Sequence, residues 1–273
     1  MRKIIIHLGM AKSASTYLQN IAIQNKEVLG RHGFVYIHEF RSVSRGASDL
    51  ARFFSESLSS NPAYNLLVSS ENFFNPNDYD DNGAYTGAIT AATYLKQAIG
   101  LLPAETQYTF VYVARNLLDF YVSKYAQLRK QGVKIDPIEY FSNIDESALS
   151  FKNILRALGL LSSIGKVHVI DFGLIEISID RFVESFFGTC RISPAALSYA
   201  TSVVNSSIND DGMMILEISK SSLNTKQFLT LRKLVQAYFP KNAPFPGEDS
   251  FRMTMHQQAH SEFRRFLELS SFY

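Results

Sequence analysis

Short apolar runs alternate with segments of helical periodicity along the first two thirds of the chain. Runs rich in β-branched and aromatic residues predict strands at 3–8, 34–37, 65–70, 108–114 and 166–171. Apolar residues three and four apart predict helices at 15–29, 47–58, 87–101, 117–130 and 151–161. Strands of this apolar kind, separated by helices, are typical of a parallel sheet. The pattern therefore predicts an α/β fold of three layers around a central, mainly parallel sheet.

The last third of the chain has mostly helical periodicity. It predicts helices at 180–187, 210–221, 226–238 and 254–269. We expect a single domain over residues 1–273, with a helical C-terminal part from about 205 to 273 that is a candidate lid over a ligand site. The proline-rich stretch from Pro240 to Pro246 is a candidate for an ordered loop or for a mobile lid.

Composition and charge exclude several classes of function. A chain of 273 residues, 46% of them hydrophobic, can bury a full core without disulfides or a structural metal. Twenty-seven Lys and Arg against 25 Asp and Glu leave a net charge of +2. That balance argues against a general affinity for nucleic acid or for anionic membranes. Any anion site must therefore be local.

Cysteine and histidine usage bears on compartment and metals. The lone Cys190 excludes an intramolecular disulfide and matches a reducing compartment, so we expect a cytoplasmic protein. No apolar stretch reaches the ~18 residues that cross a bilayer, so we expect no integral membrane segment. The five histidines after His7 show no metal-ligand spacing among themselves or with Cys190, and we expect no metal.

The first motif with chemical content is the loop at residues 7–18, between the first predicted strand and helix. Amides at a helix N-terminus bind phosphate in such loops, at the carboxyl edge of an α/β sheet. Lys12 adds a positive charge, and Ser13, Ser15 and Thr16 add hydroxyl donors. The loop is shorter than a Walker A motif and fits a diphosphate-like group. The plain alternative is a helix capped by Ser13 or Ser15, with Lys12 in solvent.

The second motif spans residues 111–125. Arg115 follows the strongest predicted strand, and Ser123 lies in the helix predicted next. A phosphate above that junction could accept hydrogen bonds from both side chains. The alternative is a surface Arg115 paired with Asp119.

Together the two motifs resemble those of the sulfotransferases that use 3′-phosphoadenosine-5′-phosphosulfate (PAPS). The first is similar to that family's 5′-phosphosulfate loop, whose usual form is Lys-Ser-Gly-Thr-Thr-Trp-Leu. The second is similar to its 3′-phosphate motif of Arg-Asn, Asp and Ser, and the resemblance is close over residues 3–20 and 107–130. It implies a P-loop-like strand, loop and helix. It also implies metal-free transfer of a sulfuryl group from PAPS to an acceptor hydroxyl or amine, leaving adenosine 3′,5′-bisphosphate.

The resemblance also implies roles for individual residues. Arg115 and Ser123 would hold the 3′-phosphate. Lys12 would in addition meet the charge that develops on the bridging oxygen as the sulfuryl group leaves. The helices from about 205 to 273 would lie on the acceptor side. The residues implied to hold the 5′-phosphosulfate are Lys12, Ser13, Ala14, Ser15 and Thr16.

The sequence departs from the family pattern at three places. Ala14 replaces the loop glycine, which is acceptable only if φ at Ala14 stays below zero. Tyr17 stands where cytosolic members carry Trp. The Arg-Lys-Gly adenine loop of those members is missing near the C-terminus, so adenine contacts cannot be assigned from the sequence.

A third candidate site follows the predicted strand at 65–70. Glu71 stands at the end of that strand beside Phe73 and Phe74, and apolar neighbours would raise its pKa toward the range of a general base. Cytosolic members of the family carry His at this strand end, whereas carbohydrate-modifying members commonly carry Glu. The resemblance therefore implies Glu71 as the base and favours glycan acceptors slightly over other small molecules. The alternative is a glutamate that caps the next turn.

Two other functions stay open at this point. A P-loop kinase or NTPase would need Mg²⁺ ligands, but the strand at 108–114 ends in Arg115 rather than in an acidic residue. A non-catalytic nucleotide-binding protein could use the same fold. The acceptor and the oligomeric state cannot be deduced from the sequence.

Overall fold

The computed structural model describes residues 1–10, 12–38, 46–70, 73–74, 85, 87–144, 146–200, 208–238 and 244–272. The contacts divide the chain into two compact units. The first unit comprises Met1–Arg115, Ser150–Thr201 and Phe263–Tyr273, and the second comprises Asn116–Leu149 and Ser202–Glu262. The single domain over residues 1–273 stays a prediction.

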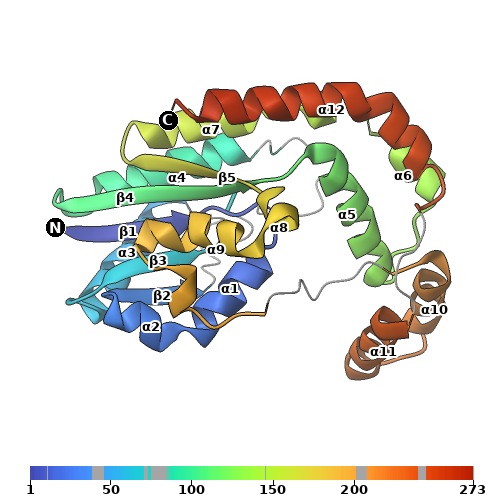
Figure 1. The fold of residues 1–273 in the computed structure, drawn as a ribbon, viewed down its shortest axis with the longest axis horizontal. Helices are drawn as coiled ribbons and strands as arrows, with labels where there is room; N and C mark the ends of the chain where they lie inside the picture. Colours follow the sequence, from blue (N-terminus) through green and yellow to red (C-terminus); the bar gives the residue numbers. More distant parts are fainter. Residues whose placement is uncertain are drawn as a thin grey trace. The chain divides into compact units, whose positions relative to one another are not determined.

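A five-stranded sheet of order β2-β3-β1-β4-β5 forms the centre of the first unit (Figure 1). All neighbouring strands are parallel. The sequence prediction of an α/β fold with a parallel sheet is confirmed, because each predicted strand has a counterpart within two residues of its expected bounds. The strands are β1 Arg2–His7, β2 Phe34–His38, β3 Asn65–Ser69, β4 Thr106–Ala114 and β5 Lys166–Asp171.

Helices cover both faces of this sheet and complete the three layers (Figure 1). Side chains alternate between faces along a strand, so Ile5, Leu67 and Val111 form a core with α1, α2, α8 and α9. Their neighbours Ile6 and Phe110 are buried on the opposite face, where α3, α4 and α7 pack side by side. The helices are α1 Ser15–Gln24, α2 Lys26–Arg31, α3 Ala47–Ser60, α4 Ala88–Gly100, α7 Lys152–Ser162, α8 Leu174–Ile177 and α9 Ile179–Phe187, followed by 3₁₀ turns at Gly188–Cys190 and Pro194–Ala196.

The helix predicted at 15–29 is two helices, and Asn25 is the physical reason. Its side chain donates to the carbonyls of Ile21 and Ser198, both at 2.8 Å, and accepts from the Ser198 amide at 2.8 Å. The Asn25 backbone, with φ −109° and ψ 28°, ends α1 and begins α2. The helical periodicity continues through the break, because the bond that fixes it comes from a residue far away in the sequence.

The second unit contains a cluster of aromatic side chains around Tyr125. Tyr125 on α5 has ring centroids 5.2 Å from Tyr140, 5.2 Å from Phe141 and 4.9 Å from Phe245. The short helix α6 has no counterpart among the predicted elements. Its start is fixed locally by Asp136, whose carboxylate accepts from the Glu139 amide. The elements are α5 Leu117–Lys130, α6 Pro137–Ser142, a 3₁₀ turn at Glu146–Leu149, α10 Asp210–Lys220, α11 Thr225–Tyr238 and α12 Glu248–Ser270, of which residues after Glu262 belong to the first unit.

The long helix α12 begins six residues earlier than predicted. Glu248 is buried, and its carboxylate accepts from the Phe245 amide at 3.1 Å and from Arg252 at 2.9 Å. These two bonds fix the first turn of α12. The candidate lid at 240–246 lies largely outside the described residues. Within the described ranges, no helix is long and apolar enough to cross a membrane.

Candidate functional site at the carboxyl edge of the sheet

The loop between β1 and α1 lies at the carboxyl ends of β1 and β4. The Leu8 amide donates to the Val111 carbonyl at 2.9 Å, which continues the sheet pairing past the end of β1. The Arg115 amide contacts Met10 Sδ at 3.3 Å, just after the end of β4. The first motif and the start of the second, up to Arg115, therefore meet at one edge of the sheet. Ala11 lies outside the described residues.

Three positive φ angles shape this loop. Gly9, Lys12 and Ala14 have φ of 60°, 64° and 59°. The condition set for alanine in place of the loop glycine, a φ below zero at Ala14, is not met, because Ala14 is the N-cap residue of α1 in the left-handed conformation. This conformation costs a residue with a Cβ roughly 1–2 kcal/mol. Position 14 therefore has a backbone conformation typical of glycine but carries an alanine.

The hydroxyls of the two loop serines form hydrogen bonds within the loop. Ser13 and Ser15 are buried, and both side chains donate to the Met10 carbonyl, Ser15 at 3.4 Å. The alternative of a helix capped by either serine is not observed, since α1 has no side-chain cap. The first amides of α1 are consequently left for solvent or an anion. Thr16 is exposed on the first turn.

Arg115 is held against the loop from the end of β4. Its guanidinium donates to the Lys12 carbonyl and lies 4.6 Å from the ring centroid of Phe172. Asp119, the alternative partner of Arg115, pairs with Arg252 at 2.8 Å. Ser123 is half-buried on α5 in the second unit, whereas Arg115 belongs to the first. Their joint hold on a phosphate stays a prediction.

The carboxyl end of β3 carries a buried polar network. His7 Nδ1 lies 2.9 Å from Ser69 Oγ, and Gln19 Nε2 donates to the same hydroxyl at 3.2 Å. Burial lowers the pKa of His7 to about 3, so its imidazole is neutral near pH 7. The network connects β1, β3 and α1, and the Ser70 amide donates to the His7 carbonyl at 3.1 Å. The network therefore fixes the strand end just before position 71.

Glu71 itself lies outside the described residues, so its role as the base stays a prediction. The apolar pair beside it is described. Phe73 and Phe74 are fully buried, with ring centroids 5.9 Å apart. The carboxylate would thus follow a fixed strand end and precede a buried aromatic pair.

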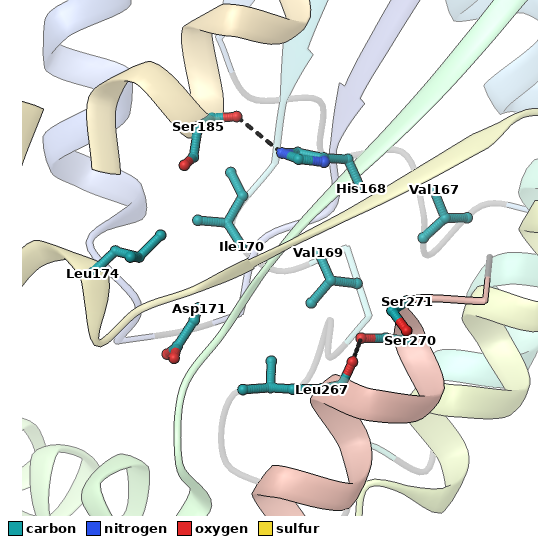
Figure 2. Close-up of a pocket in the computed structure, with 10 residues that line it drawn as sticks. All are labelled: Val167, His168, Val169, Ile170, Asp171, Leu174, Ser185, Leu267, Ser270 and Ser271. Atoms are coloured by element: carbon teal, nitrogen blue, oxygen red, sulfur yellow. Dashed lines mark hydrogen bonds between the residues drawn. The ribbon is translucent and has the colours of Figure 1, made fainter. Parts of the chain in front are cut away.

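A separate groove of about 420 Å³ follows the outer edge of β5 (Figure 2). Its walls come from α8 and α9 on one side and from the end of α12 on the other. His168 on β5 donates from Nε2 to the Ser185 carbonyl at 3.0 Å across this groove. Only its Asp171 end lies at the carboxyl edge of the sheet, and its lining includes no predicted donor-binding residue.

Two other residues bear on chemistry. Cys190 is buried, and burial raises the pKa of its thiol to about 12, which makes it unreactive at neutral pH. Within the described residues, no group of three or more His, Cys, Asp or Glu side chains could hold a metal ion, and the expectation of no metal stays a prediction. His256 and His260 are four residues apart on α12, with ring centroids 4.2 Å apart. The spacing His-x₃-His on a predicted helix was the signal that could have found them.

Comparisons with known proteins add little to this picture. No family model matches the chain, and no curated protein matches it. One similar solved structure comes from the PezAT chromosomal toxin–antitoxin system of the human pathogen Streptococcus pneumoniae. The two chains are 16% identical with a TM-score of 0.30, over 63% of this chain and 68% of that one. A likeness at that level carries no argument about function.

Proposed function

We propose that the protein is a cytoplasmic sulfotransferase, which moves a sulfuryl group from PAPS to an acceptor hydroxyl or amine. The observation that carries the proposal is the contact between the two motifs. The guanidinium of Arg115 donates to the Lys12 carbonyl, so one residue assigned to each end of the nucleotide lies at the carboxyl edge. Ligands of α/β proteins bind at that edge.

The groups at this edge suit an anionic donor. The first amides of α1 have no side-chain cap and attract a phosphate or sulfate. Lys12 and Arg115 each bring a full positive charge, and the planar guanidinium can bind a phosphate through two parallel hydrogen bonds. Ser13 and Ser15 would support the turn rather than the ligand, because their hydroxyls donate to Met10.

Each assigned residue has one part in the transfer. The acceptor oxygen or nitrogen forms a bond to sulfur as the bond from sulfur to the bridging phosphate oxygen breaks. Glu71 takes the proton that the acceptor loses. Lys12 stabilises the negative charge on the departing phosphate oxygen, and adenosine 3′,5′-bisphosphate is the second product. The carboxylate base favours a glycan acceptor.

The test is label transfer from ³⁵S-labelled PAPS, with EDTA present, to a panel of sugars, phenols and amines. We expect transfer that resists EDTA. Lys12→Ala should weaken donor binding and lower kcat together, since Lys12 faces the donor throughout. Glu71→Gln should keep donor affinity and lower kcat by about 10²–10⁴. Activity that needs Mg²⁺ and ATP would replace the proposal with a kinase.

A further inference from the structure

Two histidines on α12 form a pair that the proposed function does not use. His256 and His260 are both exposed, and their ring centroids are 4.2 Å apart at an interplanar angle of 55°. Residues four apart on a helix lie on the same face, one turn above the other. The two imidazoles therefore share one patch of surface on a helix of 23 residues.

Neither imidazole is engaged by another group of the described chain. Among the described residues, each of the two rings contacts only the other ring. His7, His38 and His168 differ in this respect, because His7 contacts Ser69, His38 Nδ1 lies 3.1 Å from the Tyr36 hydroxyl, and His168 donates to the Ser185 carbonyl. The nitrogen atoms of the α12 pair are thus available to a ligand.

We propose that His256 and His260 bind one divalent transition-metal ion, with water completing its coordination. Two imidazoles four residues apart on a helix are a common pair of metal ligands. Imidazole suits Zn²⁺, Ni²⁺ and Cu²⁺, and affinity rises toward Cu²⁺ in this series. The proposal rests on the helix geometry alone and is independent of the sulfotransferase proposal.

Charged residues on the neighbouring turns of α12 affect how tightly the histidine pair binds a cation. Arg252, one turn before His256, is neutralised by ion pairs with Asp119 and Glu248. Arg264 is exposed one turn after His260, so its charge opposes binding. Replacing that guanidinium by a neutral side chain should therefore tighten metal binding, and Arg264→Gln tests the direction.

The experiment is calorimetric titration of the untagged full chain with CuSO₄, NiCl₂ and ZnCl₂. We expect one ion per chain, bound most tightly as Cu²⁺. His256→Ala and His260→Ala should each weaken binding about tenfold or more, at least as much as loss of an outer-shell partner does in metal sites. His32→Ala, which removes an exposed histidine elsewhere, should leave the affinity unchanged.

A spacing control separates chelation from simple histidine content. The double variant His260→Ala/Ser261→His keeps two histidines but places them five residues apart, on different helix faces. It should bind as weakly as His260→Ala. Wild-type affinity in the double variant, equal losses in His32→Ala, or no binding to the unmodified chain would each overturn the proposal.

Discussion

The left-handed conformation of Ala14 is the sharpest local feature of the candidate site. Residues with a Cβ avoid this conformation, and glycine enters it freely. We predict that Ala14→Gly raises the free energy of unfolding by about 0.5–1 kcal/mol, since the relieved strain exceeds the extra unfolded-state entropy of glycine. Urea denaturation measures the change.

Two matched substitutions test the cause of that gain. Ala157→Gly makes the same change in the middle of α7 and should cost about 1 kcal/mol or more. Ala14→Val puts a β-branched residue at positive φ and should also destabilise. If Ala14→Gly proves as costly as Ala157→Gly, Ala14 does not have the left-handed conformation.

The neutral His7 makes stability depend on pH. Its folded pKa of about 3 is below the ordinary value of 6.5, so the unfolded chain binds the proton first as pH falls. The stability that His7 contributes is therefore present above pH 6.5 and is lost progressively toward pH 3. By pH 5 the loss should reach about 2 kcal/mol.

A comparison with His7→Asn isolates this effect. Asn keeps a hydrogen-bonding group for the Ser69 hydroxyl but does not titrate. Urea unfolding at pH 7 and pH 5 should show a smaller loss in the variant than in the unmodified chain. Identical losses would mean that His7 is charged in the folded protein at pH 5.

At the scale of elements, the break at Asn25 shows where a long-range bond overrides a local pattern. Asn25→Ala removes three hydrogen bonds and leaves the Ser198 amide and carbonyl without that partner. We predict a loss of about 1–3 kcal/mol, measured by urea denaturation. Asn20→Ala, on an exposed position of α1, should change stability by about 0.5 kcal/mol or less. Equal losses would show that Asn25 plays no special part.

The strands were predictable because a strand that is buried on both faces needs apolar residues at consecutive positions, as at 108–114. Helix boundaries followed the sequence where a local signal marks them, as for α5, which begins after the cap Asn116. They differed where tertiary bonds decide. Asn25 divides a predicted helix through its bonds to Ser198. The start of α12 is different, because Glu248 fixes it through a local bond from the Phe245 amide, three residues before it, ahead of the apolar pattern.

The site was predictable to a lesser degree. The register of β1 against β4 brings Lys12 and Arg115 to one edge, as expected of neighbouring parallel strands. The hydroxyls of Ser13 and Ser15 could not be assigned from composition, because a serine can serve a ligand or its own turn. The backbone conformation of Ala14 could not be predicted, since residue type alone does not fix φ under tertiary constraint.

At the scale of the molecule, the net charge of +2 leaves affinity for an anion to local groups. A binding site for the 3′-phosphate would make the protein prefer PAPS over adenosine nucleotides that lack this group. Arg115 and Ser123 are the residues assigned to that phosphate, and of the two only Arg115 brings a charge. Its loss should therefore remove the preference for a 3′-phosphate rather than general nucleotide binding.

The most direct test of the proposed function is calorimetry of the full chain with adenosine 3′,5′-bisphosphate and with AMP, both in EDTA. We predict clear preference for the bisphosphate. Arg115→Ala should lose about 1.5–3 kcal/mol of that binding, the range for hydrogen bonds to charged groups, and should bind AMP almost as before. Equal affinity of the unmodified chain for the two nucleotides would contradict the account.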